Sequence, residues 1–264
     1  MFLSMKLSDV RLLWVFSLFL LPLFGCVKEK RGECPCRLVV GLEEVDSSHI
    51  SDVFVSVTGT GDFGYGEVRE AETYQDDKVV LVPRGEVFLN VYHEDQGMRD
   101  SAGICIPLGE ECPSVYMYSA YMDTDCEYVR KQVLLSKNHC VITVYVEGAD
   151  ESFPFGMSLR GNVCGYDLYG DPRSGDFICS MEACGDMQYT GVVPRQRDPS
   201  LMLEVKDGEE VVRAFAVGEY IRSSGYDWTE TDLKDIMIGI DYSRTLITVS
   251  VRGWDEVYEF DVVI

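Results

Sequence analysis

Two cysteines separated by a single proline, Cys34-Pro35-Cys36, are the first residues of this sequence whose type and spacing could do chemistry. Close thiol pairs can act as redox centres or as metal clamps. A redox pair usually has two intervening residues and stands at the start of a helix, whereas this pair leads directly into the strand-like run Arg37 to Val40. We therefore predict a structural role for Cys34 and Cys36, as members of a disulfide.

A second motif, the six residues from Gly59 to Gly64, matches the dinucleotide-binding fingerprint letter for letter. That fingerprint needs a helix directly after it, because backbone N–H groups at the helix start bind the pyrophosphate. The residues from Tyr65 to Val68 do not resemble a helix start, and no alternation of strand and helix surrounds them. The motif therefore predicts a turn and not a nucleotide site.

Three acidic residues, Asp123, Asp125 and Glu127, alternate in the way that ligands of a hard cation can. The segment lacks the glycine of an EF-hand loop, and an alternating strand would place all three carboxylates on one solvated face. Weak surface binding of Ca²⁺ is the alternative to that solvated face. The three histidines, His49, His93 and His139, are far apart in the sequence. Only His139 has a cysteine next to it, Cys140, and two adjacent side chains point to opposite faces of a strand. We predict no metal site.

Catalytic patterns are weak in this chain. No Gly-x-Ser-x-Gly frame, the usual setting of a hydrolase serine, is present. A glycosidase needs two carboxylates a few ångströms apart, and the many acidic residues give no pair that sequence alone can single out. We predict that the protein is not an enzyme and that it carries no cofactor.

The N-terminus has the form of a secretory signal. Lys6 and Arg11 precede an apolar run from Leu12 to Phe24, and a small residue, Gly25, stands before Cys26. The run is shorter than the roughly 20 residues that cross a bilayer. Cys26 fits a bacterial lipobox, in which the chain is cut before the cysteine and its thiol is acylated, for example by palmitate. We predict a signal peptide over residues 1–25 and lipidation of Cys26; the alternative is an ordinary signal peptide cut near Gly25.

Charge and cysteine content limit the partners and the compartment. A net charge of −22 repels phosphate backbones and anionic membrane faces, which excludes nucleic-acid binding and leaves the lipid as the membrane attachment. Ten cysteines in an exported protein indicate disulfides. Without Cys26 the number is odd, so at least one thiol is free or pairs with another chain. The sequence leaves the connectivity open among the others, at positions 34, 36, 105, 112, 126, 140, 164, 179 and 184.

Short alternating runs separated by turn signals fill the rest of the chain, which is typical of an all-β sandwich or barrel. Val87, Leu89 and Val91, for example, share one face of a run. One helical turn is expected at Asp232 to Asp235, capped by Thr229 or Thr231. The expected strands cover residues 36–43, 53–58, 77–82, 86–92, 114–120, 128–135, 140–147, 156–163, 187–193, 201–206, 210–217, 236–241, 245–252 and 256–263.

An internal echo suggests that the chain contains two copies of one β-domain. The segment Cys140 to Glu151 resembles the segment Thr245 to Glu256. A spacing this large is far beyond the periods of solenoid repeats. We predict an N-terminal β-sandwich domain over residues 26–149 and a C-terminal one over residues 150–264, joined near Gly148 to Pro154.

Several of these features together resemble the fimbrial anchor lipoproteins, the FimB-like minor fimbrial subunits of Gram-negative anaerobes. The resemblance rests on the lipobox cysteine followed by Cys34-Pro35-Cys36-Arg37-Leu38, and on later segments that cover most of the mature chain. These segments are Leu159-Arg160-Gly161 to Gly175, Val192-Val193-Pro194-Arg195, Asp207-Gly208, Gly218-Glu219-Tyr220-Ile221, Trp228, Asp232-Leu233-Lys234-Asp235 and the run through Trp254.

The resemblance implies two tandem transthyretin-like β-sandwich domains and a non-catalytic role. Such a subunit sits on the cell surface, with its lipid in the outer membrane, and tethers a fimbria to the cell or regulates its assembly or length. Its partners would be fimbrial shaft subunits, joined by strand exchange, in which main-chain hydrogen bonds supply the affinity. We expect the terminal strand, Glu256 to Ile264, to be the edge used, because it ends the chain on an apolar alternation.

The alternative is a surface lipoprotein that binds glycan in a nutrient-uptake system; an adhesin on the same scaffold is a third option. Glycan binders present exposed aromatic platforms, and Trp228 and Trp254 are the residues to consider. Tryptophan in a sandwich more often fills the core. An open sheet edge would favour the anchor, and a groove lined by Tyr and Trp would favour the glycan binder.

Overall fold

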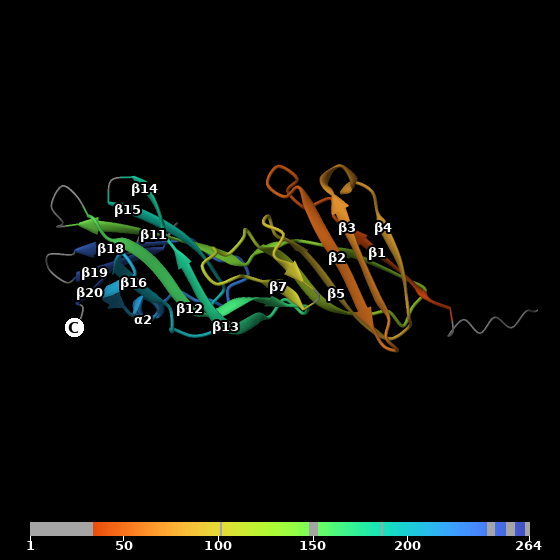
Figure 1. Cartoon of the computed structure of the whole chain (residues 1–264). Helices are drawn as coiled ribbons and strands as arrows, with labels where there is room; N and C mark the ends of the chain where they lie inside the picture. The colour runs from red at the N-terminus through yellow and green to blue at the C-terminus, as the bar shows by residue number, and fades with distance from the viewer. Residues whose placement is uncertain are drawn as a thin grey trace, which may run out of the picture. The chain divides into compact units, whose positions relative to one another are not determined.

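Alternating apolar residues form strands with one buried face in the computed structural model of the chain (Figure 1). Val53, Val55 and Val57 of β2 (Asp52–Gly59) are at most 1% exposed, while the residues between them face outward. The structure describes residues 34–100, 102–147, 153–185, 187–241, 246–251 and 257–261. Contacts within the chain unite residues 35–264 into one compact unit. Within the described ranges, no helix has the length and apolar character needed to cross a membrane.

The first sandwich consists of a three-stranded sheet, in the order β4-β1-β9, facing a five-stranded sheet, in the order β10-β8-β5-β2-β3. Valine and leucine side chains from both sheets form one cluster, and burying each contributes roughly 1.5–3 kcal/mol. The strands other than β2 are β1 (Cys36–Gly41), β3 (Gly64–Glu70), β4 (Lys78–Val82), β5 (Glu86–His93), β8 (Tyr116–Asp123), β9 (Tyr128–Gln132) and β10 (Ser136–Lys137), and a short 3-10 helix, η3, covers Ala71–Thr73.

The second sandwich has two six-stranded sheets, one in the order β14-β15-β11-β18-β19-β20 and one in the order β17-β16-β12-β7-β6, with β13 also paired to β12. A separate apolar cluster fills the space between them. The elements are β6 (Arg99–Asp100), β7 (Gly103–Cys105), β11 (His139–Glu147), β12 (Gly156–Asp167), β13 (Pro172–Ser180), β14 (Glu182–Gly185), β15 (Gln188–Pro194), β16 (Met202–Asp207), β17 (Glu210–Phe215), α2 (Val217–Ser223), β18 (Ile236–Asp241), β19 (Leu246–Val251) and β20 (Val257–Asp261).

The two sandwiches repeat one topology. In the first, β1 pairs antiparallel with β4 and parallel with β9. In the second, β11 pairs antiparallel with β15 and parallel with β18. The facing sheets correspond as well, since β8-β5-β2-β3 matches β17-β16-β12-β13. The predicted fold class, all-β with two tandem sandwiches, is therefore confirmed.

The similarity between the segments Cys140 to Glu151 and Thr245 to Glu256, which suggested a duplication, does not relate one sandwich to the other. It aligns β11 with β19, and both strands lie in the same sheet on either side of β18. The counterpart of β11 in the first sandwich is β1. The division of the chain at residues 149 and 150 stays a prediction, although β11 precedes it and pairs only with β15 and β18, which follow it.

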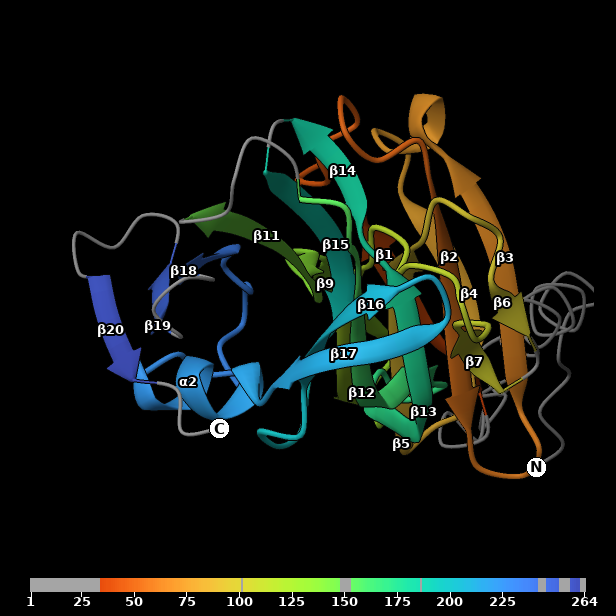
Figure 2. The ribbon, with the colours of Figure 1, turned by 60° about the vertical axis from the view of Figure 1, so that its left-hand side comes forward.

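The predicted helical turn at Asp232 to Asp235 is wrong. This segment has no regular secondary structure and lies beside the start of β11, where the Asp232 and Asp235 carboxylates accept hydrogen bonds from the backbone N–H groups of Lys137 (2.8 Å) and Val141 (2.9 Å). These tertiary hydrogen bonds fix the segment against β11 in place of a local helical turn. The helix of this region is α2, which lies near β20 (Figure 2). The Tyr220 ring of α2 packs against the Phe260 ring of β20, with centroids 5.2 Å apart.

Candidate functional site

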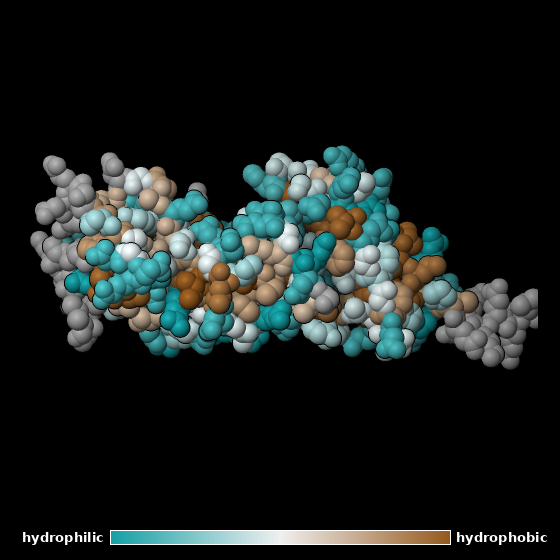
Figure 3. Space-filling model, viewed as in Figure 1, coloured by the Kyte–Doolittle hydropathy of each residue, from teal (hydrophilic) through white to brown (hydrophobic). Residues whose placement is uncertain are grey.

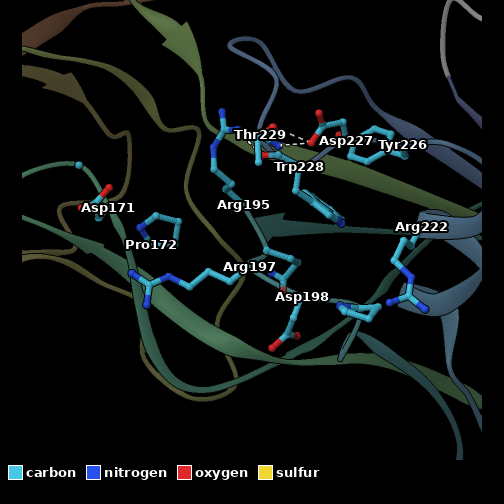
Figure 4. Close-up of a pocket in the computed structure, with 13 residues that line it drawn as sticks. Asp171, Pro172, Arg195, Arg197, Asp198, Arg222, Tyr226, Asp227, Trp228 and Thr229 are labelled. Atoms are coloured by element: carbon cyan, nitrogen blue, oxygen red, sulfur yellow. Dashed lines mark hydrogen bonds between the residues drawn. The ribbon is translucent and has the colours of Figure 1, made fainter.

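A cavity of about 720 Å³ opens on the second sandwich, where three loops converge (Figure 4). One loop joins β12 to β13, the second follows β15, and the third follows α2. The lining residues are Gly170, Asp171, Pro172, Arg195, Gln196, Arg197, Asp198, Pro199, Arg222, Tyr226, Asp227, Trp228 and Thr229. We refer to it as the arginine pocket, after its three arginines.

Local sequence shapes the loops of the arginine pocket. Strand β15 ends at Pro194, which has no N–H to continue a ladder. Asp227 caps the next loop, since its carboxylate accepts hydrogen bonds from the backbone N–H (2.8 Å) and hydroxyl (2.7 Å) of Thr229. The Asp198 carboxylate likewise accepts a hydrogen bond from the backbone N–H of Ser200. These hydrogen bonds lower the pKa of both carboxyl groups, so both are ionised at neutral pH.

Arg195 holds the loop after α2 in place. Its guanidinium donates hydrogen bonds to the backbone carbonyls of Trp228, Glu230 (2.7 Å) and Thr231 (3.2 Å). It also donates to the side-chain oxygen of Asn138 at 3.0 Å. Burial lowers the pKa of Arg195, but an arginine keeps its proton in proteins. Arg195 is therefore a positively charged clamp on the wall of the pocket.

Trp228 and Tyr226 line the pocket but belong to the core. Trp228 is 9% exposed, and its ring packs edge-on against Tyr226 with centroids 4.9 Å apart. The Tyr226 hydroxyl donates a hydrogen bond to the carbonyl of Lys234 at 2.8 Å, and burial raises its pKa. Trp228 thus fills the sandwich and offers no stacking platform, and Trp254 lies outside the described residues.

The open side of the pocket is formed by two exposed arginines. Arg197 extends toward Pro172 in Figure 4 and donates a hydrogen bond to the Ser174 hydroxyl at 3.2 Å. Arg222 pairs with the Glu219 carboxylate. A guanidinium presents a planar fork that fits carboxylate, sulfate or phosphate oxygens. The whole chain has a net charge of −22, but these two arginines form a local positive site that can bind an anion.

The cysteines singled out from sequence lie apart from the arginine pocket. Cys26 lies outside the described residues, and its lipidation stays a prediction. Cys34 is exposed, whereas Cys36 begins β1 and is fully buried in the first core. A disulfide between Cys34 and Cys36 also stays a prediction.

The fingerprint-like motif is a turn, as predicted. It joins β2 to β3, and Gly61 and Asp62 adopt φ values of 68° and 61°, the left-handed conformation of tight hairpin loops. Asp125 donates its backbone N–H to the Asp123 carboxylate at 2.9 Å, as in a local turn. Among the described residues, no three His, Cys, Asp or Glu side chains gather in a way that could hold a metal ion.

The predicted assembly edge, Glu256 to Ile264, is described over β20. This strand pairs with β19 and is the outermost described strand of its sheet. Val257 is 65% exposed. Apolar residues gather in patches between hydrophilic ones on the face seen in Figure 3. Among the described strands, β20 is therefore the outermost of its sheet, and it carries one largely exposed apolar side chain.

Comparison with known proteins identifies the fold. No protein-family model matches the chain, and no curated protein matches its sequence. A proposed polysaccharide-binding protein from Bacteroides thetaiotaomicron has the same fold, with a TM-score of 0.63 and 12% identity over 85% of this chain and 98% of that chain. The fimbrial anchor protein Mfa2 from Porphyromonas gingivalis gives a TM-score of 0.58 and 12% identity, over 84% and 98%. A proposed adhesin from Bacteroides ovatus gives 0.58 and 11%, over 86% and 95%.

Proposed function

We propose that this chain is a fimbrial anchor or minor subunit, held in the outer membrane by a lipid on Cys26 and joined to a shaft subunit through a sheet edge. The observation that carries the proposal is the shared fold. The tandem sandwiches correspond to those of the fimbrial anchor protein Mfa2 over nearly the whole of that chain. The signal-like N-terminus ending at Cys26 agrees with this role.

Strand β20 is the edge that we propose for assembly. An edge strand offers unpaired backbone N–H and C=O groups, and a partner strand that pairs with them extends the sheet. The side chains of Val257 and Glu259 face solvent on β20, while those of Tyr258 and Phe260 are half-buried. This alternation supplies a register for an added strand.

A Cys26→Ala variant tests the anchoring role on cells. We expect fibres to form but to shed into the medium, or to grow to abnormal length, because the subunit at their base has lost its lipid. The control is Cys184→Ala, which removes an exposed cysteine on β14 and should leave fibres attached. If no fibre is associated with the protein in either strain, the anchor proposal fails.

A Val257→Lys variant tests the edge. A lysine on an edge strand opposes the addition of another strand, so we expect co-purification with the shaft subunit to fall about tenfold, equivalent to roughly 1.4 kcal/mol. Val212→Lys is the matched control, because Val212 is 46% exposed on β17, the edge of the other sheet. An equal loss in both variants would point to a general charge effect and remove β20 from the proposal.

The arginine pocket favours a second candidate function, the binding of an anionic glycan. One neighbour in fold is a proposed polysaccharide-binding protein, and the pocket gathers guanidinium groups in an acidic chain. Calorimetric titration with an oligouronate should give binding that Arg197→Gln weakens about tenfold. Arg130→Gln, on a surface arginine of the first sandwich that pairs with Glu43 and Asp77, should leave binding unchanged. Equal binding of neutral and acidic oligosaccharides would contradict a role for the arginines.

A further inference from the structure

Two cysteines lie near each other at one end of the first sandwich, one at the start of β1 and the other just before β9. Strands β1 and β9 run parallel, with Arg37 opposite Tyr128. Ahead of that pair, the Arg37 backbone N–H donates a hydrogen bond to the Glu127 carbonyl at 3.0 Å. By this register Cys36 lies opposite Glu127, and Cys126 is the residue directly before Glu127. The two cysteines therefore lie on neighbouring segments, offset by one residue.

Both cysteines belong to one packed region. Cys36 is fully buried in the first core, and the half-buried Cys126 packs against the same cluster. The Cys126 thiol donates a hydrogen bond to the carbonyl of Tyr128 at 3.3 Å. Burial, and after it the neighbouring Cys126, raise the pKa of Cys36. Because the two residues lie on neighbouring strands and pack in one cluster, a movement of their side chains can bring the sulfurs to the roughly 2.05 Å of a disulfide.

We propose that Cys36 and Cys126 form a disulfide in the exported protein, which ties the start of β1 to the segment that leads into β9. The proposal requires that the protein is exported, because disulfides persist in oxidising compartments. It does not depend on the fimbrial role or on the arginine pocket. It replaces the pairing of Cys36 with Cys34, because one sulfur can form only one such bond.

The bond forms by exchange with a disulfide-bearing thiol oxidant of the exporting compartment. The Cys126 thiol, which solvent reaches, loses its proton and attacks the oxidant, forming a mixed disulfide and releasing one thiolate. The Cys36 sulfur, once deprotonated, then displaces the second oxidant sulfur. Two protein thiols become one S–S bond, the oxidant disulfide becomes two thiols, and the protons from Cys36 and Cys126 pass to them.

The proposal leaves out three buried thiols of the second sandwich. Cys112, Cys140 and Cys179 point their sulfurs at backbone carbonyls, those of Pro113 at 3.4 Å, Lys234 at 3.2 Å and Val192 at 3.9 Å. Burial raises the pKa of each of them, as it does that of Cys36. The proposed cross-link is therefore confined to the first sandwich by the pairing of β1 with β9 and not by the pKa of the thiols.

Peptide mapping of the wild-type chain is the first test. The full chain is extracted from the producing cells, alkylated in denaturant without reduction, digested and analysed by mass spectrometry. We expect a cross-linked peptide pair that contains Cys36 and Cys126 and that disappears on reduction. A cross-link between Cys34 and Cys36, or alkyl label on both Cys36 and Cys126, would overturn the proposal.

Thiol counts of two single variants provide an independent test. Cys126→Ala should gain one thiol over wild type, because Cys36 is released from its bond. A pairing of Cys34 with Cys36 predicts instead that Cys34→Ala gains a thiol and Cys126→Ala loses one. A loss of one thiol in both variants would mean that neither Cys34 nor Cys126 is bonded, which would overturn the proposal. Because the count is made in denaturant, it does not require either variant to fold.

Discussion

The two sandwiches share a strand order but carry different additions. The second extends one sheet beyond the common plan with β19 and β20, inserts α2 before β18, and surrounds the arginine pocket with loops. The first keeps a three-stranded sheet and brings Cys36 and Cys126 together at the end of that sheet. Where one fold is used twice, the added elements are where the copies can differ in role. The two proposals above accordingly place ligand or partner binding in the second sandwich and a disulfide in the first.

Core truncation should have the largest effect and should show whether the two sandwiches respond separately. Leu89 and Leu203 are both fully buried, on the corresponding strands β5 and β16, and they belong to separate clusters. Leu89→Ala and Leu203→Ala should each lower the free energy of unfolding by about 2–5 kcal/mol. Hydrogen exchange followed by mass spectrometry should show faster exchange mainly in the sandwich that carries the change. Equal acceleration in both sandwiches would mean that they unfold as one.

Treatment with a reductant should distinguish the two sandwiches, because only the first contains the proposed disulfide. The proposed bond closes a loop of about 90 residues, and its loss should lower the free energy of unfolding by roughly 2–4 kcal/mol. Urea unfolding of the wild type, with and without a reductant, measures this difference. The Cys126→Ala variant should be insensitive to the reductant, whereas Cys179→Ala should respond like the wild type. An unchanged wild-type midpoint would count against the bond.

Two arginines allow a comparison of buried and exposed contacts. Replacing Arg195 by Lys removes the fork that binds three carbonyls, and unsatisfied buried groups cost about 1–3 kcal/mol. Arg130 is 38% exposed and bridges Asp77 and Glu43, so Arg130→Lys should cost less than about 1 kcal/mol. Chemical denaturation gives both values, and hydrogen exchange should quicken at residues 226–231 in the Arg195 variant alone. Similar costs would show that Arg195 is not a clamp.

The smallest effect concerns pH. His139 is 5% exposed and lies beside Tyr116 and the Val115 carbonyl. Burial lowers the pKa of His139, and the positive charge of Lys137 lowers it further. The carboxylates of Asp235 and Asp95 act in the opposite direction. The unfolded state therefore binds the proton more readily. The contribution of neutral His139 to stability is complete above the unfolded pKa of about 6.5 and is lost as pH falls below it.

A His139→Asn variant measures that contribution. Its free energy of unfolding should fall less between pH 7.5 and 5.5 than that of the wild type. The control is His49→Asn, at an exposed position of the first sandwich, which should keep the wild-type slope. Parallel slopes for all three proteins would mean that other groups carry the pH dependence.

Alternation of apolar residues was enough to predict most strands. The range 236–241 of β18 is reproduced to the residue, and β5 extends the predicted run by only one residue. Strand β13 was missed because few of its side chains, notably Phe177 and Cys179, face the core. Its pairing with β12 contains two register shifts, and such irregular pairing leaves no regular pattern in the sequence.

Features that depend on distant residues were not predictable. The predicted strand 210–217 ran into the first residue of α2, Val217, and the helix itself was not predicted. It is fixed by packing, since a Cβ on Gly218 would lie 2.4 Å from the Pro199 carbonyl. The arginine pocket combines three loops far apart in sequence, so no local motif could reveal it. The only available signal was Arg195 and Arg197 between two prolines in an acidic chain.

The parallel pairing of β1 with β9 bears on how the first sandwich would carry a mechanical load. The chain enters this sandwich at the start of β1, and β9 ends at the far end of the same sheet, followed within the sandwich by the short β10. A pull on the start of β1 and the end of β9 slides the two strands along each other, and their five registered pairs share the force. Peeling would break such hydrogen bonds one at a time. A subunit stretched between a membrane and a fibre would therefore load this pair of strands in its more resistant direction.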